Sequence, residues 1–242
     1  MIRSFLAAIT MITCLPAGKF MPSERDLQLC SNWFPVIGLL AGCMLYCPAF
    51  YAVKWFGAAG AVLILVLLEA ISKGFHLDGL ADTADAFLSS RPRERKLEIM
   101  HDSHTGTMGV AAIVLLLLGK FAFFSQLSPS RAAAMTLLCA FGGRLALTLY
   151  ILISHYARPQ GLGLILYARR PYWGALLGLC LAAGASWWFS GHCFLFLPLV
   201  FFVVAWDRIC RLQIGGATGD TVGACEQLAE LLTCLLVREC LG

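Results

Sequence analysis

Three aspartates recur at helical spacing in the segment 75–87, which reads FHLDGLADTADAF. Asp78, Asp82 and Asp85 stand at positions i, i+4 and i+7, which fall on one face of an α-helix. Like charges at this spacing repel each other, and a divalent cation would relieve the repulsion. Oxygen ligands without cysteine favour Mg²⁺, or Mn²⁺, over zinc. The spacing therefore predicts a Mg²⁺ site; the alternative is a solvated acidic face on a surface helix.

Two further polar stretches follow this acidic segment. The basic run 91–96, RPRERK, suits phosphate oxygens, and it fits an anchor at the lipid headgroups equally well. Asp102 lies in the segment 98–109, EIMHDSHTGTMG, and is a candidate fourth metal ligand. Residues 75–109 thus bring acids and bases together in a short part of the chain.

A glycine-rich turn, GGATGDTVG at 215–223, precedes the last apolar run. Free backbone N–H groups at a helix N-terminus offer a favourable site to a phosphate. Glycines also serve tight turns and close helix packing, so the turn alone is weak evidence. Asp220 strengthens it, because a carboxylate there can bind a metal ion or a ribose hydroxyl. Arg158, in the polar segment 155–163, adds a cation.

The elements that position these residues are membrane helices. Of the 242 residues, 60% are hydrophobic and 13% charged, which favours a bilayer as solvent. Segment 5–16 predicts a re-entrant or interfacial helix. We expect one domain over 1–242, an all-α polytopic membrane helix bundle with six to seven transmembrane helices. The candidate spans are 33–53, 57–71, 107–126, 132–154, 172–189, 193–206 and a shorter run, 224–237.

The distribution of positive charge sets the expected orientation. With a cytoplasmic N-terminus, the opposite side holds only Lys54, Arg131 and Arg238. The segments 76–104, 155–171 and 207–220 then face the cytoplasm together, in a multi-pass protein of the cell (inner) membrane. In such a protein the net charge of +4 is no sign of a nucleic-acid partner; the expected partner is the lipid bilayer. The oligomeric state, including a homo-oligomer, stays open.

Charged residues inside the predicted spans need partners. Arg144 should be paired or face a polar cavity, because an unpaired intramembrane arginine is costly. Glu69 stands four residues before Lys73, which predicts a local i, i+4 ion pair. The eleven cysteines are odd in number and form no CxxC pair, so neither a disulfide framework nor a zinc site is indicated.

Four motifs in order, FHLDGLADTAD, EIMHDSHTGTMG, YARPQGLG and GGATGDTVGA, resemble those of the cobalamin synthase family, the adenosylcobinamide-GDP ribazoletransferases. The resemblance extends from Trp33 to Glu226. It implies that a hydroxyl of α-ribazole, or of its 5′-phosphate, attacks the cobinamide-proximal phosphorus of adenosylcobinamide-GDP and expels GMP. The product would be adenosylcobalamin or its phosphate. Phosphoryl transfer of this kind requires mainly positioning and charge neutralisation.

Roles for individual residues follow from motifs and resemblance together. One or two Mg²⁺ ions (or Mn²⁺) are expected on Asp78, Asp82, Asp85 and Asp102. The proton acceptor for the attacking hydroxyl is one of the acids, Asp82 or Asp85, or else His76. Substrate phosphates, corrin amides and the nucleotide are expected on Arg93, Arg95, Arg158, Gly215, Gly216, Thr218, Gly219 and Asp220.

Two other functions use carboxylates on membrane helices. A CDP-alcohol phosphotransferase would require the pattern D-x₂-D-G-x₂-A-R, whereas here Gly79 directly follows Asp78 and no Ala-Arg follows. A cation transporter would need its acids near the bilayer midplane. Here they cluster at one predicted edge of the membrane, beside arginines that repel cations. The sequence therefore favours the transferase.

Overall fold

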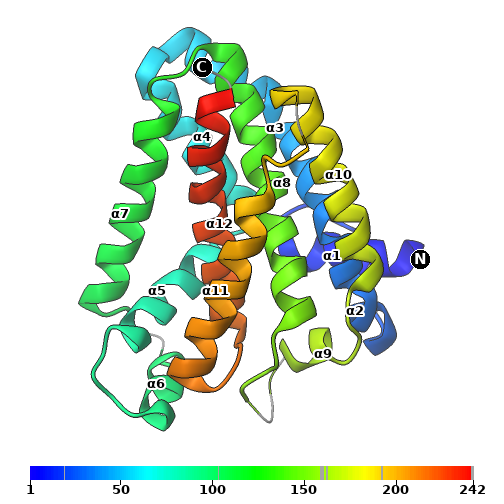
Figure 1. Cartoon of the computed structure of the whole chain (residues 1–242), viewed down its shortest axis with the longest axis vertical. Helices are drawn as coiled ribbons and strands as arrows, with labels where there is room; N and C mark the ends of the chain where they lie inside the picture. The colour runs from blue at the N-terminus through cyan, green and yellow to red at the C-terminus, as the bar shows by residue number, and fades with distance from the viewer. Residues whose placement is uncertain (19, 103, 159–160, 162, 192, 241–242) are drawn as a thin grey trace.

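The chain forms a bundle of long helices running side by side along one axis (Figure 1). The computed structural model describes residues 1–242 except 19, 103, 159–160, 162, 192 and 241–242, and contains no β-strand within that part. The long helices are α3 (Phe34–Phe56), α7 (Thr107–Phe124), α8 (Pro129–Ile153), α10 (Tyr172–Ser190), α11 (Leu197–Ile214) and α12 (Gly219–Cys240). Shorter helices are α1 (Ile2–Ile12), α2 (Glu24–Cys30), α4 (Gly60–Ile71), α5 (Phe75–Phe87), α6 (Arg93–Ile99) and α9 (Gly163–Tyr167).

Four helical stretches within the described residues are long and apolar enough to cross a membrane: Glu24–Ile71, Thr107–Phe124, Pro129–Ile153 and Tyr172–Ser190. The first of them includes both α3 and α4. The prediction of an all-α polytopic membrane bundle is thereby confirmed. The predicted last two spans are also helical, as α11 and α12, but they are more polar than these four stretches. The count of six to seven spans stays a prediction.

Helix α11 continues well past the apolar run that predicted it. The run ends at Trp206, whereas the helix ends at Ile214. Asp207 and Arg211 lie one turn apart in this extension and form an ion pair of 2.6 Å between Oδ2 and Nε. Hydrophobicity marks only the part of a helix that faces apolar surroundings, so polar turns beyond it escape such a prediction.

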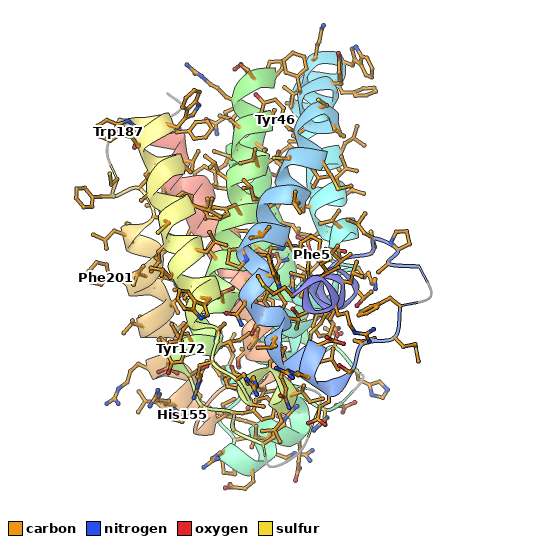
Figure 2. The ribbon with its side chains drawn as sticks, turned by 90° about the vertical axis from the view of Figure 1, so that its right-hand side faces the viewer. Phe5, Tyr46, His155, Tyr172, Trp187 and Phe201 are labelled. Atoms are coloured by element: carbon orange, nitrogen blue, oxygen red, sulfur yellow. The ribbon has the colours of Figure 1, made fainter. Side chains whose placement is uncertain are left out.

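Exposed aromatic side chains mark both ends of α10 (Figure 2). Tyr172 and Trp173 lie at one end of the helix, Trp187 and Trp188 at the other, and all four are exposed. Between these levels Phe201 of α11 is 69% exposed. Aromatic rings of this kind prefer the two membrane–water interfaces, and purely apolar side chains prefer the hydrocarbon. The arrangement places the surface of the bundle against lipid.

Helix α1 lies across the long helices rather than along them (Figure 1). Its small residues Ala7 and Ala8 are fully buried in the hydrophobic core, and Ser4 accepts a hydrogen bond of 3.1 Å from the Trp33 indole. The opposite side exposes Ile2. This crosswise, one-sided packing agrees with the predicted interfacial or re-entrant helix.

Helices α3 and α8 approach closely through glycines. A Cβ at Gly42 would lie 2.7 Å from the carbonyl oxygen of Leu137, and one at Gly38 would lie 2.7 Å from that of Ala140. Small residues let helix backbones pack closely in a membrane, where burial of apolar groups from water adds little. Helix α8 is correspondingly the most buried of the four long apolar stretches, with 83% of its most apolar part inside the bundle.

We expect Gly42→Ala to destabilise the bundle by about 1–3 kcal/mol, because its methyl group must displace the α8 backbone. The matched control is Gly184→Ala on α10, where a Cβ meets nothing within 4 Å. The control should be neutral or slightly stabilising, since alanine favours helix over glycine. Thermal unfolding in one detergent measures both. Equal melting temperatures would contradict the tight α3–α8 contact.

A cluster of charged side chains occupies the interior of the bundle. Lys120 of α7 is 1% exposed and its Nζ lies 2.7 Å from Glu230 Oε2 of α12 and 3.2 Å from Glu69 Oε1 of α4. Arg144 of α8, also 1% exposed, places Nη1 2.5 Å from Glu230 Oε1 and contacts Glu226. The expectation that Arg144 is paired is confirmed. We call these residues, with Gln227, the buried charge network.

The predicted Glu69–Lys73 pair is wrong. Both carboxylate oxygens of Glu69 point into the network, where Oε1 contacts Lys120 and Oε2 accepts a 3.0 Å hydrogen bond from Gln227. Helix α4 ends at Ile71, and Lys73 has a left-handed φ of 58° in the following turn. The local spacing therefore no longer puts Glu69 and Lys73 on one helical face.

Candidate active site at one end of the bundle

The three predicted polar segments meet at one end of the bundle. Figure 1 shows α5, α6, α9 and the turn between α11 and α12 together at that end. Two backbone hydrogen bonds join the second and third segments: Ala157 donates to Ala217 over 2.8 Å, and Ala217 donates to His155 over 2.7 Å. The Arg158 guanidinium lies 3.2 Å from the Asp220 carboxylate. The residues that sequence patterns singled out are therefore spatial neighbours.

Glycines also allow α5 to cross α12 at very short distance. A Cβ at Gly79 would lie 2.7 Å from the Asp220 carbonyl oxygen, and a Cβ at Gly223 would lie 3.1 Å from the His76 Cα. Any larger residue would push the helices apart. This crossing brings the acidic face of α5 next to the N-terminal turn of α12.

Asp82 stands in the centre of the acidic group. Partial burial raises its pKa to about 7, and the negative charges of Asp78, Asp220 and Asp85 add to the rise, while Arg158 opposes it. Within the described residues, no protein hydrogen bond or ion pair engages the side chains of Asp78 or Asp82. An uncompensated set of carboxylates of this kind attracts a cation or a proton.

The Asp85 carboxylate, unlike those of Asp78 and Asp82, accepts hydrogen bonds from the protein backbone. Its Oδ2 accepts a hydrogen bond of 2.7 Å from the Gly106 amide, and Oδ1 accepts one of 2.8 Å from the Gly109 amide. These amides belong to the start of α7, so the Asp85 carboxylate caps a helix that is distant in sequence. A Cβ at Gly106 would lie 2.5 Å from Asp85 Oδ1, so any larger residue there would displace this carboxylate. Sequence spacing did not reveal this capping role.

Asp102 is exposed and binds its own loop. Its Oδ1 accepts hydrogen bonds from the His104 amide over 3.1 Å and contacts His104 Nδ1 at 2.6 Å. These bonds lower the pKa of the Asp102 carboxyl. The described residues contain no group of three or more His, Cys, Asp or Glu side chains arranged to hold a metal ion. The four predicted ligands thus do not converge on one point in this structure.

Asp220 and its loop form the other wall of the site. Asp220 Oδ2 lies 3.2 Å from both Arg158 Nη2 and Thr218 Oγ1. Burial raises the pKa of Asp220, and Arg158 opposes the rise. Thr218 and Thr221 exchange hydrogen bonds between side chain and backbone, 2.8 and 3.2 Å long, in the manner of a capping box. Thr218 is fully buried, so these bonds fix the turn.

The two candidate arginines of α6 have different surroundings. Arg93 packs its guanidinium against the turn: a Cβ at Gly215, which has a left-handed φ of 82°, would lie 2.5 Å from Arg93 Cζ. Arg95 is largely exposed and pairs with Glu98 at 2.6 Å. Arg93 thus belongs to the site with Arg158, whereas Arg95 points toward solvent. Gly216 and Gly219 lie in the same turn, and Gly219 begins α12.

His76 points to the interior. It is 2% exposed, and its Nδ1 lies 3.2 Å from Glu226 Oε2 of α12. Glu226 and Glu230 were not singled out by sequence reasoning. A usable signal existed, since two acids in an apolar run require cations, and the predicted spans contain Lys120 and Arg144.

Comparisons with known proteins show the family to which the chain is related. The family model described as cobalamin-5-phosphate synthase matches residues 4–238. An adenosylcobinamide-GDP ribazoletransferase of Desulforamulus reducens is 35% identical over 98% of this chain and 96% of the relative. One of Klebsiella pneumoniae is 36% identical, covering 96% and 98%, and one of Pseudomonas aeruginosa is 37% identical, covering 95% of each. No solved structure matches the chain.

The match covers nearly the whole chain and both sets of site residues, the acidic face of α5 and the turn before α12. Its relatives carry the name of a transferase of cobalamin assembly. The chain belongs to the cobalamin-5-phosphate synthase family.

Proposed function

We propose that this protein is an adenosylcobinamide-GDP ribazoletransferase. A hydroxyl of α-ribazole, or of α-ribazole 5′-phosphate, attacks the cobinamide-side phosphorus of adenosylcobinamide-GDP. The new P–O bond forms as the bond to the GMP phosphate oxygen breaks, giving adenosylcobalamin, or its 5′-phosphate, and GMP. The observation that carries the proposal is the meeting of unpaired carboxylates, two arginines and the turn before α12 at one end of the bundle.

The residues of the chain have distinct roles in this reaction. Arg158 and Arg93 hold phosphate oxygens, as guanidinium groups do with two parallel donors. The Asp220 carboxylate keeps Arg158 in place at 3.2 Å. Asp82, whose pKa is near 7, accepts the proton of the attacking hydroxyl. Asp85 holds the start of α7 against α5 and so shapes the site.

The donor set fits Mg²⁺. Asp78 and Asp82 offer oxygens, and Mg²⁺ is commonly held by one or two carboxylates together with substrate phosphates and water. Asp85 and Asp102 already accept hydrogen bonds, and Asp82 serves as the base, so we place the ion on Asp78 together with substrate phosphates, with Mn²⁺ as a substitute. When bound, Mg²⁺ supplies charge neutralisation for the diphosphate and for GMP as it leaves.

The decisive experiment measures GMP release by purified protein in detergent or liposomes. The substrates are adenosylcobinamide-GDP and either α-ribazole or its 5′-phosphate, with Mg²⁺ or with EDTA. We expect release that depends on the metal and on the acceptor. Folded protein that releases no GMP with either acceptor would contradict the proposal. If EDTA left GMP release unchanged, the proposed transfer reaction would stand, but its dependence on a metal ion would be contradicted.

The rate of GMP release should rise with pH as Asp82 loses its proton. Asp82 acts as a carboxylate whose pKa is raised to about 7 when no metal ion is bound. A bound Mg²⁺ beside it lowers this pKa, so the midpoint of the rate should lie at about 7 or somewhat below it. Asp220→Asn removes one of the raising charges and should shift the midpoint to lower pH. A rate profile of wild type and variant at constant ionic strength measures both midpoints. A midpoint near 4 in the wild type would contradict this role of Asp82.

We further propose that the site faces the cytoplasm in the inner membrane. The site end holds the clustered arginines of α6, together with Arg158, and positive charge favours the cytoplasmic side. Helix α12 runs from the site to the opposite end, so the C-terminus would be periplasmic (Figure 1). An alkaline phosphatase fused to the C-terminus should be active, and a fused green fluorescent protein dark. An inactive phosphatase and a fluorescent green fluorescent protein would show that the C-terminus and the site have the opposite orientation.

A further inference from the structure

Helix α5 carries ionisable side chains on two sides with different surroundings. Asp78 is exposed at the site, whereas His76, two residues earlier, is buried on the opposite side against α12. His76 Nδ1 lies 3.2 Å from Glu226 Oε2, and both side chains are at most 3% exposed. The same helix therefore connects the candidate active site with the membrane interior.

The contact continues into the buried charge network. Glu226 also contacts Arg144 of α8, and Arg144 contacts Glu230 at 2.5 Å. Glu230 contacts Lys120 of α7 at 2.7 Å, and Lys120 contacts Glu69 of α4 at 3.2 Å. One connected set of charges thus joins α5, α12, α8, α7 and α4. Glu226 is held by Arg144 and is a fixed point for His76.

The crossing of α5 and α12 explains why such a fixed point is needed. At the crossing, Gly79 faces the Asp220 backbone and Gly223 faces His76. Glycines allow close approach, but a smooth contact does not fix how far one helix slides along the other. A slip by one helical turn would displace Asp82 by about 5.4 Å. The His76–Glu226 contact lies beside this crossing, one turn from Gly79 on α5 and one turn from Gly223 on α12, and it pairs two particular side chains.

We propose that His76 is a positioning residue: through Glu226 it fixes the register of α5 on α12, and thereby the placement of Asp78 and Asp82 beside Asp220 and Arg158. The inference rests on the proposed function for its catalytic consequence, but not for its effect on metal binding. The His76 ring is 2% exposed and its Nδ1 faces Glu226, so Nδ1 is not directed at a substrate hydroxyl. His76 acts on the chemistry only through the carboxylates of its own helix.

The test compares two substitutions at one position. His76→Asn keeps an N–H donor at the position of Nδ1, whereas His76→Leu keeps the volume and removes the donor. The matched control is Glu69→Gln, which alters the network at its far end on α4. Binding of Mn²⁺ alone, followed by electron paramagnetic resonance in detergent, reports on the acids without substrate. The kcat and KM of GMP release, and melting temperatures, are measured on the same samples.

We expect His76→Leu to weaken Mn²⁺ binding and to lower kcat by about 10-fold or more, as removal of residues that orient metal ligands does. His76→Asn should restore most of both, which a proton-accepting role for His76 would not allow. Glu69→Gln should lower the melting temperature while its Mn²⁺ affinity remains close to wild type.

Three outcomes would overturn the proposal. If His76→Leu bound Mn²⁺ as tightly as the wild type, His76 would have no positioning role. The same would follow if His76→Leu and Glu69→Gln lost Mn²⁺ affinity equally. Failure of the wild type to bind Mn²⁺ would remove this role too, whatever the GMP assay shows. Wild-type Mn²⁺ binding that is weakened by His76→Leu, without any GMP release, would contradict only the proposed function.

Discussion

Replacing Asp82 by asparagine is expected to lower the rate of GMP release at least about 100-fold, the size of effect typical of a lost acid–base group. Asp82 lies at the centre of the acidic group, between the charges of Asp78, Asp85 and Asp220. The variant keeps the shape of the side chain and removes a proton acceptor and one of the negative charges beside the metal ion. The rate is measured with saturating Mg²⁺ at pH 8, where wild-type Asp82 is ionised.

The loss should occur without loss of stability. Because the folded state raises the pKa of Asp82, the folded protein binds this proton more tightly than the unfolded chain does. Ionised Asp82 therefore disfavours the fold at pH 8, and the neutral amide should leave the melting temperature unchanged or raise it. A lower melting temperature, or nearly wild-type release, would contradict the assignment.

A matched control carries the same chemical change at the same end of the bundle. Asp207 of α11 pairs with Arg211 at 2.6 Å and lies outside the acidic group. Asp207→Asn should leave GMP release within about threefold of wild type, as substitutions outside a site usually do. Comparable losses in both variants would mean that Asp82 acts through the general charge of this end rather than through a specific role.

Replacing Arg144 by leucine is expected to have the largest effect on stability. Its guanidinium contacts both Glu226 and Glu230, and all three side chains are at most 1% exposed. Removing one partner of a buried ion pair leaves uncompensated charge and commonly costs about 3–5 kcal/mol. Arg131→Leu, on the exposed first turn of the same helix α8, is the control and should change the melting temperature little.

The double variant Arg144→Leu, Glu230→Leu separates charge imbalance from lost packing. It removes one positive and one negative charge, so less charge stays uncompensated than in Arg144→Leu alone. We expect its melting temperature to lie above that of the single variant. If Arg144→Leu were no less stable than Arg131→Leu, the buried charge network would have no part in holding the bundle together.

The sequence correctly predicted the features that depend on neighbouring residues along the chain. Apolar runs located the membrane helices, because a helix that crosses hydrocarbon must satisfy its backbone internally and present apolar side chains. The helical repeat placed Asp78, Asp82 and Asp85 on one face of α5. The charge distribution placed the glycine-rich turn before α12 and Arg158 on the same side of the membrane, and the structure makes them neighbours. Within these limits the site could be outlined before the fold was known.

Contacts between distant segments were decided only by the tertiary structure. The sequence paired Glu69 with Lys73, whereas packing of α4 against α7 gives it Lys120. It treated Asp85 as a metal ligand or base, and the fold places its carboxylate on the amides of Gly106 and Gly109. Helical periodicity fixes which residues share a face of one helix. Which charge lies opposite that face depends on how the helices cross, and close glycine contacts determine that crossing.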